Sequence, residues 1–187
     1  GSDMYIPVYD NTLATRFSTP FFQPMYTRIP EPISKNQGDN ISLTAIANQS
    51  ADMKLFLNGN QIQSATGVTT ISANPVLTTS GNQTIRVDAT VGATTKSESF
   101  QFYVAPAVTI AALPAGVRDG INYETGNTSA VLVLYAPGKN RVSVIGEFPG
   151  SNWSEQTAYQ MNKTPDGNYW WLRITGLTAG QEYAFQY

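Results

Sequence analysis

The chain of 187 residues contains neither cysteine nor histidine. Without cysteine no disulfide bond can form, so the fold must be held by packing and hydrogen bonds. Catalytic sets of the Ser-His-Asp or Cys-His kind cannot be built from this composition. Structural zinc and blue copper lose their usual ligands, and so does haem bound through histidine. We therefore expect no metal and no cofactor.

Charge is scarce as well. The chain has 11 Lys and Arg residues against 13 Asp and Glu residues, which gives a formal net charge of −2. This balance offers no basic surface for nucleic acid or for an anionic membrane. No stretch approaches the roughly 20 apolar residues that a membrane-spanning helix needs. We expect neither nucleic acid nor a membrane span.

The residues that are abundant favour an exported bacterial β-protein. Apolar residues make up 41% of the chain, which is enough for a folded core. Thr, Asn, Ser and Gln are frequent, as is common in extracellular bacterial β-domains. We expect a secreted, cell-surface or periplasmic location in a bacterium. Gly1-Ser2 resembles a protease scar and no signal peptide follows it, so the natural start is expected to be missing.

Strand patterns dominate the first hundred residues. Apolar and polar residues alternate with the period of two that a half-buried strand requires. The alternating segments are residues 41–47, 53–57, 85–91 and 96–104. Asn58-Gly59 accepts the positive φ angles of a type I′ turn and predicts a hairpin between 53–57 and 61–64. Because no segment shows a capped helical stripe, residues 1–106 are predicted to form one immunoglobulin-like β-sandwich.

Residues 20–34 interrupt this regular pattern. They contain four prolines, and proline cannot donate to a β-ladder. The segment is therefore expected to be an edge strand or a loop. For its aromatic cluster of Phe21, Phe22 and Tyr26, local packing is favoured over a ligand-binding surface.

The second half predicts another sandwich, over residues 107–187. Pro106 and Pro114 bracket a short apolar segment that marks the domain junction. Residues 130–135 are apolar on both faces, as in a central strand, and 165–168 (Pro-Asp-Gly-Asn) predict a hairpin turn. The last expected strand, 183–187, reaches the end of the sequence. We therefore expect a fragment of a longer protein, with the second sandwich incomplete in its last strands and an open edge available for association.

Several stretches of this second half form a family pattern. They are ALPAGVRDGINY at 112–123, VLVLYAPGK at 131–139, VIGEF at 144–148, NWS at 152–154, MNKTPDGN at 161–168, GL at 176–177 and EYAFQY at 182–187. Together they resemble the isoamylase N-terminal domain, also called carbohydrate-binding module family 48. That domain precedes the catalytic barrel of secreted bacterial α-amylases of glycoside hydrolase family 13. Residues 5–104 more loosely resemble the immunoglobulin-like domain that often precedes this module.

This resemblance implies a non-catalytic accessory region of a starch- or glycogen-degrading enzyme. Such a region supports the catalytic barrel and contacts α-glucan weakly. Glycogen-binding relatives stack a sugar on the tryptophan of the Asn-Trp pair, which is Trp153 here. Gln186 stands where those relatives carry a sugar-contacting lysine, and their second stacking tryptophan has no counterpart up to Tyr187.

The sequence allows two roles each for Trp171 and Trp153. Trp170, Leu172 and Ile174 share one face of a predicted strand and are expected in the core, which turns Trp171 outward. Trp171 then packs against a protein partner or stacks on a sugar, and partner packing is favoured because interfaces are enriched in large aromatics. For Trp153, in the loop 149–155, a sugar platform and a loop anchor are both open.

No acidic residues form a recognisable catalytic pair. Retaining glycoside hydrolysis needs two carboxylates about 5–5.5 Å apart, and no spacing pairs Glu147, Glu155 or Asp166 in this way. We expect solvated carboxylates and no enzymatic activity. A second hypothesis is a structural or adhesive spacer of tandem immunoglobulin-like domains at the bacterial cell surface. The spacer predicts scattered apolar exposure, whereas barrel support predicts a contiguous apolar patch.

Overall fold

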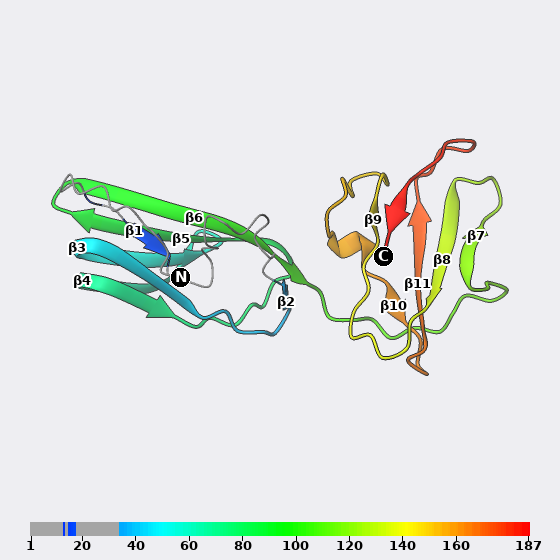
Figure 1. Cartoon of the computed structure of the whole chain (residues 1–187), viewed down its shortest axis with the longest axis horizontal. Coiled ribbons are helices and arrows are strands. Elements are labelled where there is room, and N and C mark those ends of the chain that lie inside the picture. Colours follow the sequence, from blue (N-terminus) through cyan, green and yellow to red (C-terminus); the bar gives the residue numbers. More distant parts are fainter. Residues whose placement is uncertain (1–12, 14, 18–33) are drawn as a thin grey trace, which may run out of the picture. The chain divides into compact units, whose positions relative to one another are not determined.

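The computed structural model describes residues 13, 15–17 and 34–187 (Figure 1). This part of the chain is all-β apart from the short 3₁₀ turn η1, Thr157–Tyr159. Its contacts divide into two units, the first ending at Val104 and the second spanning Ala105–Tyr187. Each is an immunoglobulin-like β-sandwich, as the alternating patterns predict. The aromatic cluster predicted at Phe21, Phe22 and Tyr26 lies outside the described residues.

The first unit is built on one continuous sheet. Its strands are β1 (Thr15–Phe17), β2 (Ser34–Asn36), β3 (Leu43–Leu57), β4 (Asn60–Ala73), β5 (Gly81–Val91) and β6 (Thr94–Ala105). They follow the order β1-β3-β5-β6-β2, with β4 on the other edge of β3. The ring of Phe17 in β1 meets Phe100 in β6 edge-on at 4.9 Å, although the two strands are not hydrogen-bonded neighbours. The sheet therefore closes over a shared core.

The Asn58-Gly59 turn is confirmed, because both residues have positive φ angles, 51° and 81°. The two strands predicted at 41–47 and 53–57 are in fact one, since β3 runs through both. Its pairing with β4 shifts register between Ile46 and Ala51, so a bulge absorbs the polar residues between them. Sequence alternation breaks at a bulge even though the strand continues.

The second unit has two sheets of unequal size. The larger is ordered β10-β11-β8-β7 and the smaller β12-β9. The strands are β7 (Gly120–Tyr123), β8 (Ser129–Tyr135), β9 (Ile145–Gly146), β10 (Asn162–Lys163), β11 (Tyr169–Thr175) and β12 (Phe185–Gln186). The core includes Trp170, Leu172 and Ile174 from β11, as predicted, together with Phe148 and Met161. The predicted hairpin turn at 165–168 is also present, between β10 and β11.

Apolar and polar residues alternate over residues 141–146, but the strand that forms there is shorter than this pattern. Val142, Val144 and Gly146 are buried and the residues between them are less so, but only Ile145–Gly146 forms a strand. The earlier residues pair irregularly: Val144 N–H donates to Tyr159 C=O, and Met161 N–H donates to Val142 C=O. The alternation of apolar and polar residues therefore reflects which side chains are buried here, and it does not indicate a regular β-ladder.

The segment predicted to link two domains is hydrogen-bonded to β10. Lys163 N–H donates to Thr109 C=O, and Ala111 N–H donates to Lys163 C=O, each at 2.9 Å. Ile110 consequently forms a parallel bridge with Lys163. Residues 109–111 thus extend the larger sheet by a short edge. Independent domains at 1–106 and 107–187 remain a prediction.

Candidate functional site

Trp153 lies in a loop that is locked by hydrogen bonds. Its N–H donates to Gly146 C=O at 3.2 Å, which ties the loop to β9. Ser151 is fully buried, and its Oγ accepts the N–H of Gly146 at 3.1 Å. Ser154 Oγ donates to Ser151 C=O at 2.8 Å. Trp153 is nevertheless 45% exposed, so a fixed backbone presents this residue to solvent.

The backbone of this loop is strained at the tryptophan. Asn152 and Trp153 have φ angles of 47° and 56°, both in the left-handed region. Asparagine tolerates this region, whereas a bulky residue there is an outlier that costs on the order of 1–3 kcal/mol. Strain of this kind is found mainly at functional sites. The observation points to Trp153 as a presented side chain.

Gln186 is connected to this loop through β9. It pairs with Ile145 on β9, and the next β9 residue, Gly146, accepts the N–H of Trp153. Phe185 packs against the core, and its ring contacts that of Tyr187 at 5.5 Å. Because side chains alternate along a strand, Gln186 points away from the core and is exposed. The structure thus attaches Trp153 and Gln186 to neighbouring positions of β9.

Trp171 lies apart from them, on β11 of the larger sheet. Its indole N–H donates to Ala111 C=O at 3.0 Å, and the side chain is half-buried. Val131 and Val133, its neighbours on the same face of β8, are only 1% exposed. The indole therefore ties Ala111 to the sheet. The geometry favours an anchor for residues 109–111 over a sugar platform.

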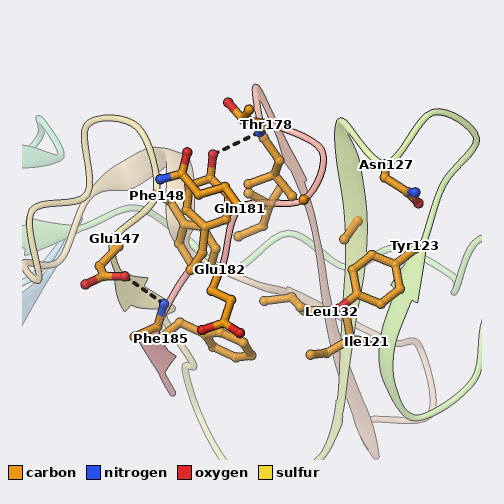
Figure 2. A pocket seen from close by; sticks show the side chains of 16 residues that line it. Ile121, Tyr123, Asn127, Leu132, Glu147, Phe148, Thr178, Gln181, Glu182 and Phe185 are labelled. Atoms are coloured by element: carbon orange, nitrogen blue, oxygen red, sulfur yellow. Dashed lines mark hydrogen bonds between the residues drawn. The ribbon is translucent and has the colours of Figure 1, made fainter.

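A groove of about 710 Å³ opens between the two sheets (Figure 2). Ile121 and Tyr123 of β7 form one wall, and Glu182 and Phe185 lie on the other. Core side chains of Leu132, Phe148 and Ile174 also line it. Ile121 and Tyr123 are 47% and 72% exposed. The groove is large enough for a ligand or for a chain segment.

The carboxylates singled out in the sequence have separate structural roles. Glu147 Oε2 accepts the N–H of Ala184 at 3.0 Å, and Glu155 forms an ion pair with Arg141 at 3.1 Å. The hydroxyl of Thr164 and the backbone and side chain of Asn168 donate to Asp166 and lower its pKa. Across the described residues, no group of three Asp or Glu side chains could hold a metal ion.

Comparison with known families places one match within the second unit. Residues 120–187 match the family model described as carbohydrate-binding module 48 (isoamylase N-terminal domain). No curated protein sequence matches the chain. Within the described part of the chain, no helix is long and apolar enough to cross a membrane.

Solved structures show only a distant likeness. Bacteroides uniformis β-glucuronidase 3 is 10% identical with a TM-score of 0.36, over 94% of this chain and 24% of that one. SGBP-B of the Bacteroides ovatus mixed-linkage glucan utilization locus, solved with a mixed-linkage heptasaccharide, is 18% identical with a TM-score of 0.35, over 92% and 43%. A chimeric titin Z1Z2-Z1Z2 tandem is 14% identical with a TM-score of 0.33, over 83% and 91%. The chain spans less than half of the first two proteins, and these scores carry no functional argument.

Some residues that build the site carry no sequence signal. Ser151 is one of many serines, and only its complete burial shows that it holds the Trp153 loop. Glu147 is an ordinary acidic residue until the fold brings Ala184 beside it, 37 residues away in sequence.

Proposed function

We propose that this chain is a non-catalytic accessory region of a bacterial α-glucan-degrading enzyme, secreted or at the cell surface, whose second unit contacts α-glucan weakly through Trp153. The catalytic barrel of glycoside hydrolase family 13 would be the protein partner that this region supports. The match of residues 120–187 to a carbohydrate-binding module is the observation that carries the proposal. The strained, exposed Trp153 in a locked loop supports the choice of site.

The physical basis is stacking of a sugar on an indole. The C–H face of a glucose ring is apolar and can lie on the exposed ring of Trp153, while Gln186 offers amide donors and acceptors on the adjacent strand. Aromatic contacts are worth about 0.5–1.5 kcal/mol beyond the area that they bury. A single platform therefore supports a Kd of about 1 mM, which corresponds to about −4.1 kcal/mol, and no tighter binding.

Titration of maltoheptaose, followed by NMR shifts of the tryptophan indole signals, tests the proposal. We expect the Trp153 signal to move and the affinity to fall roughly two- to twelvefold or more in Trp153→Ala. Tyr135→Ala is the matched control, because Tyr135 is 55% exposed on β8 of the same unit. Micromolar affinity, or an affinity unchanged in Trp153→Ala, would place the site elsewhere.

The non-catalytic part of the proposal has its own test. Glu147 and Glu155 are engaged by Ala184 and Arg141, and Asp166 is held in a turn. We expect no release of reducing ends when the purified protein is incubated with soluble starch. Turnover that survives further purification would contradict a purely accessory role, and its loss in Glu147→Gln would assign that turnover to this carboxylate.

A further inference from the structure

A tyrosine outside the Trp153 loop holds the first residue of that loop. The loop begins at Pro149, directly after Phe148, which is a core residue. The hydroxyl of Tyr159 donates to the C=O of Pro149 at 2.6 Å. Tyr159 belongs to η1, which follows the loop in sequence. The hydrogen bond therefore spans the loop and ties its first residue to the turn that comes after it.

Tyr159 is itself held in place by its backbone and by its ring. Its N–H donates to Gln156 C=O at 3.0 Å, and its C=O accepts the N–H of Val144 at 2.9 Å. Its ring lies 5.7 Å from that of Phe148, with an angle of 28° between the two planes. Burial raises the pKa of the Tyr159 hydroxyl, so the hydroxyl keeps its proton at neutral pH. Tyr159 is therefore a fixed hydrogen-bond donor.

The C=O of Pro149 lies at the centre of a tight turn. Ser151 N–H donates to Phe148 C=O at 2.9 Å, and Gly150 has a φ of 81°. Proline at the second position and glycine with a positive φ at the third are typical of a type II β-turn. Because glycine also adopts negative φ, rotation of the peptide between Pro149 and Gly150 would convert the turn to type I. The hydroxyl of Tyr159 binds the C=O whose direction distinguishes the two turns, and it therefore favours type II.

This turn is connected to Trp153 through Ser151. The Oγ of Ser151 accepts the N–H of Gly146, and its C=O accepts hydrogen bonds from both the N–H and the Oγ of Ser154. Trp153 lies between these two serines with a φ of 56°, a conformation that is retained only where the surrounding contacts enforce it. A second conformation of the turn would move Ser151 and release part of this constraint.

We infer that Tyr159 is a positioning residue for the sugar platform: its hydroxyl holds the turn at 148–151 in one conformation and thereby fixes the indole of Trp153 for stacking. The stacking part of this inference rests on the proposed function. A platform that is ordered before binding loses less conformational freedom when a sugar stacks on it. The apparent affinity falls with the fraction of molecules that hold the competent conformation. Tyr159 thus acts on the affinity through Trp153.

Tyr159→Phe tests this inference, because it keeps the ring on Phe148 and removes only the hydroxyl. Nuclear spin relaxation of the tryptophan indole N–H groups, measured without sugar, should show Trp153 to be more mobile in the variant than in the wild-type protein. The indoles of Trp170 and Trp171 each donate to a backbone carbonyl, so their signals are internal references and should not change. The affinity for maltoheptaose should fall about two- to fivefold.

Tyr183→Phe is the matched control. The Tyr183 ring also stacks on Phe148, at 6.2 Å, and its hydroxyl also binds one backbone group, the N–H of Thr178 at 2.9 Å. Both substitutions therefore remove one hydroxyl–backbone hydrogen bond beside the same core ring, but of the two tyrosines only Tyr159 binds the Trp153 loop. Tyr183→Phe should leave the relaxation of Trp153 and the affinity unchanged.

Three results would overturn the inference. The first is a Trp153 indole that is as ordered in Tyr159→Phe as in the wild-type protein. The second is an equal gain in mobility in Tyr183→Phe, which would reflect a general loss of stability in the second unit. The third is a wild-type affinity in Tyr159→Phe although Trp153 has become mobile. Failure of the proposed function is seen separately, as an affinity that Trp153→Ala leaves unchanged, and the relaxation without sugar then still decides whether Tyr159 holds the loop.

Discussion

The two units are ordered by different kinds of contact. In the first, strands β3 to β6 are 11 to 15 residues long and hold one another through extended backbone ladders. In the second, the strands are two to seven residues long. Side chains there bind distant backbone groups, as Trp171 binds Ala111 and Glu147 binds Ala184. Short strands leave the connecting loops to carry more of the structure, and the candidate site lies in one of them.

This difference has a functional consequence. A long ladder tolerates a change in one side chain, because its neighbours keep the register. A loop fixed by single side chains can present one residue in a strained conformation, as the second unit presents Trp153. Single substitutions should therefore have sharper local effects in the second unit than in the first.

The largest effect is expected from Gly146→Ala. An added Cβ would lie 2.8 Å from Phe185 Cβ and would collide with the carbonyl oxygen of Ala184, so β12 would have to leave β9. Overpacking of this kind, with backbone as the obstacle, should destabilise the second unit by about 3 kcal/mol. Hydrogen exchange resolved by residue would show faster exchange near Phe185 and unchanged exchange at Val87 in β5 of the first unit.

Gly150→Ala is the matched control for this prediction. Gly150 has a φ of 81° and open space around it, so alanine there meets only backbone strain of about 1–2 kcal/mol. Equal effects of the two substitutions would show that β12 is not closely packed on β9. A matching loss of protection at Val87 would show that the two units unfold as one.

A smaller effect is expected when Trp171 loses its donor. Trp171→Phe keeps an aromatic ring but leaves Ala111 C=O without the indole N–H, which should cost about 1 kcal/mol. Residues 105–111 should become more sensitive to proteolysis, while affinity for maltoheptaose stays the same. A fall in affinity would instead assign Trp171 to sugar stacking, which is the other role that the sequence allows for this outward-facing side chain.

The contrast between the units also explains what could be read from the sequence. Period-two alternation and the Asn58-Gly59 turn are local signals, so they predicted the hairpin of the first unit and the core face of β11. The anchor between Trp171 and Ala111 joins residues 60 apart, which no local pattern encodes. Continuation of β3 through a bulge was missed for a related reason, since the bulge depends on its pairing with β4.

The residues of the candidate site also fall into two groups, those that the sequence indicates and those that only the structure reveals. Trp153 was identified through its resemblance to a family motif, and the Asn-Trp pair gave no sign that the tryptophan itself would adopt a positive φ. Ser151, which fixes the loop from within the core, has no motif of its own. The family motif thus points to the exposed residue of this candidate site, whereas the buried residues that position it have no sequence signal.

Trp153 allows the strain in its loop to be measured. Trp153→Ala and Trp153→Gly remove the same indole, but only glycine adopts a φ of 56° freely. Glycine should therefore leave the second unit more stable than alanine by roughly 0.5–1 kcal/mol, after its greater freedom in the unfolded chain is subtracted. Chemical denaturation of the two variants measures the difference. An alanine variant as stable as the glycine variant would mean that the loop relaxes and stores no strain.

The smallest effect is expected at the turn that joins β10 and β11. Thr164 and Asn168 donate to Asp166 and lower its pKa, so the carboxylate stabilises the folded state at neutral pH. This contribution is present above the pKa of the unfolded chain, about 4, and is lost as the pH falls through the lower folded-state value. Asp166→Asn should lower the Tm slightly at pH 7, and the two proteins should converge below pH 3 or so.

The first unit supplies the comparison for this last prediction. Asp39 accepts the N–H of Asn36 at 2.8 Å in a turn of the first unit. Asp39→Asn should change the stability of the first unit alone, as Asp166→Asn should change that of the second. A calorimetric scan of each variant at pH 7 and at low pH separates the two. A difference between Asp166→Asn and wild type that persists at low pH would show that asparagine disturbs the turn itself, rather than removing the contribution of the charge.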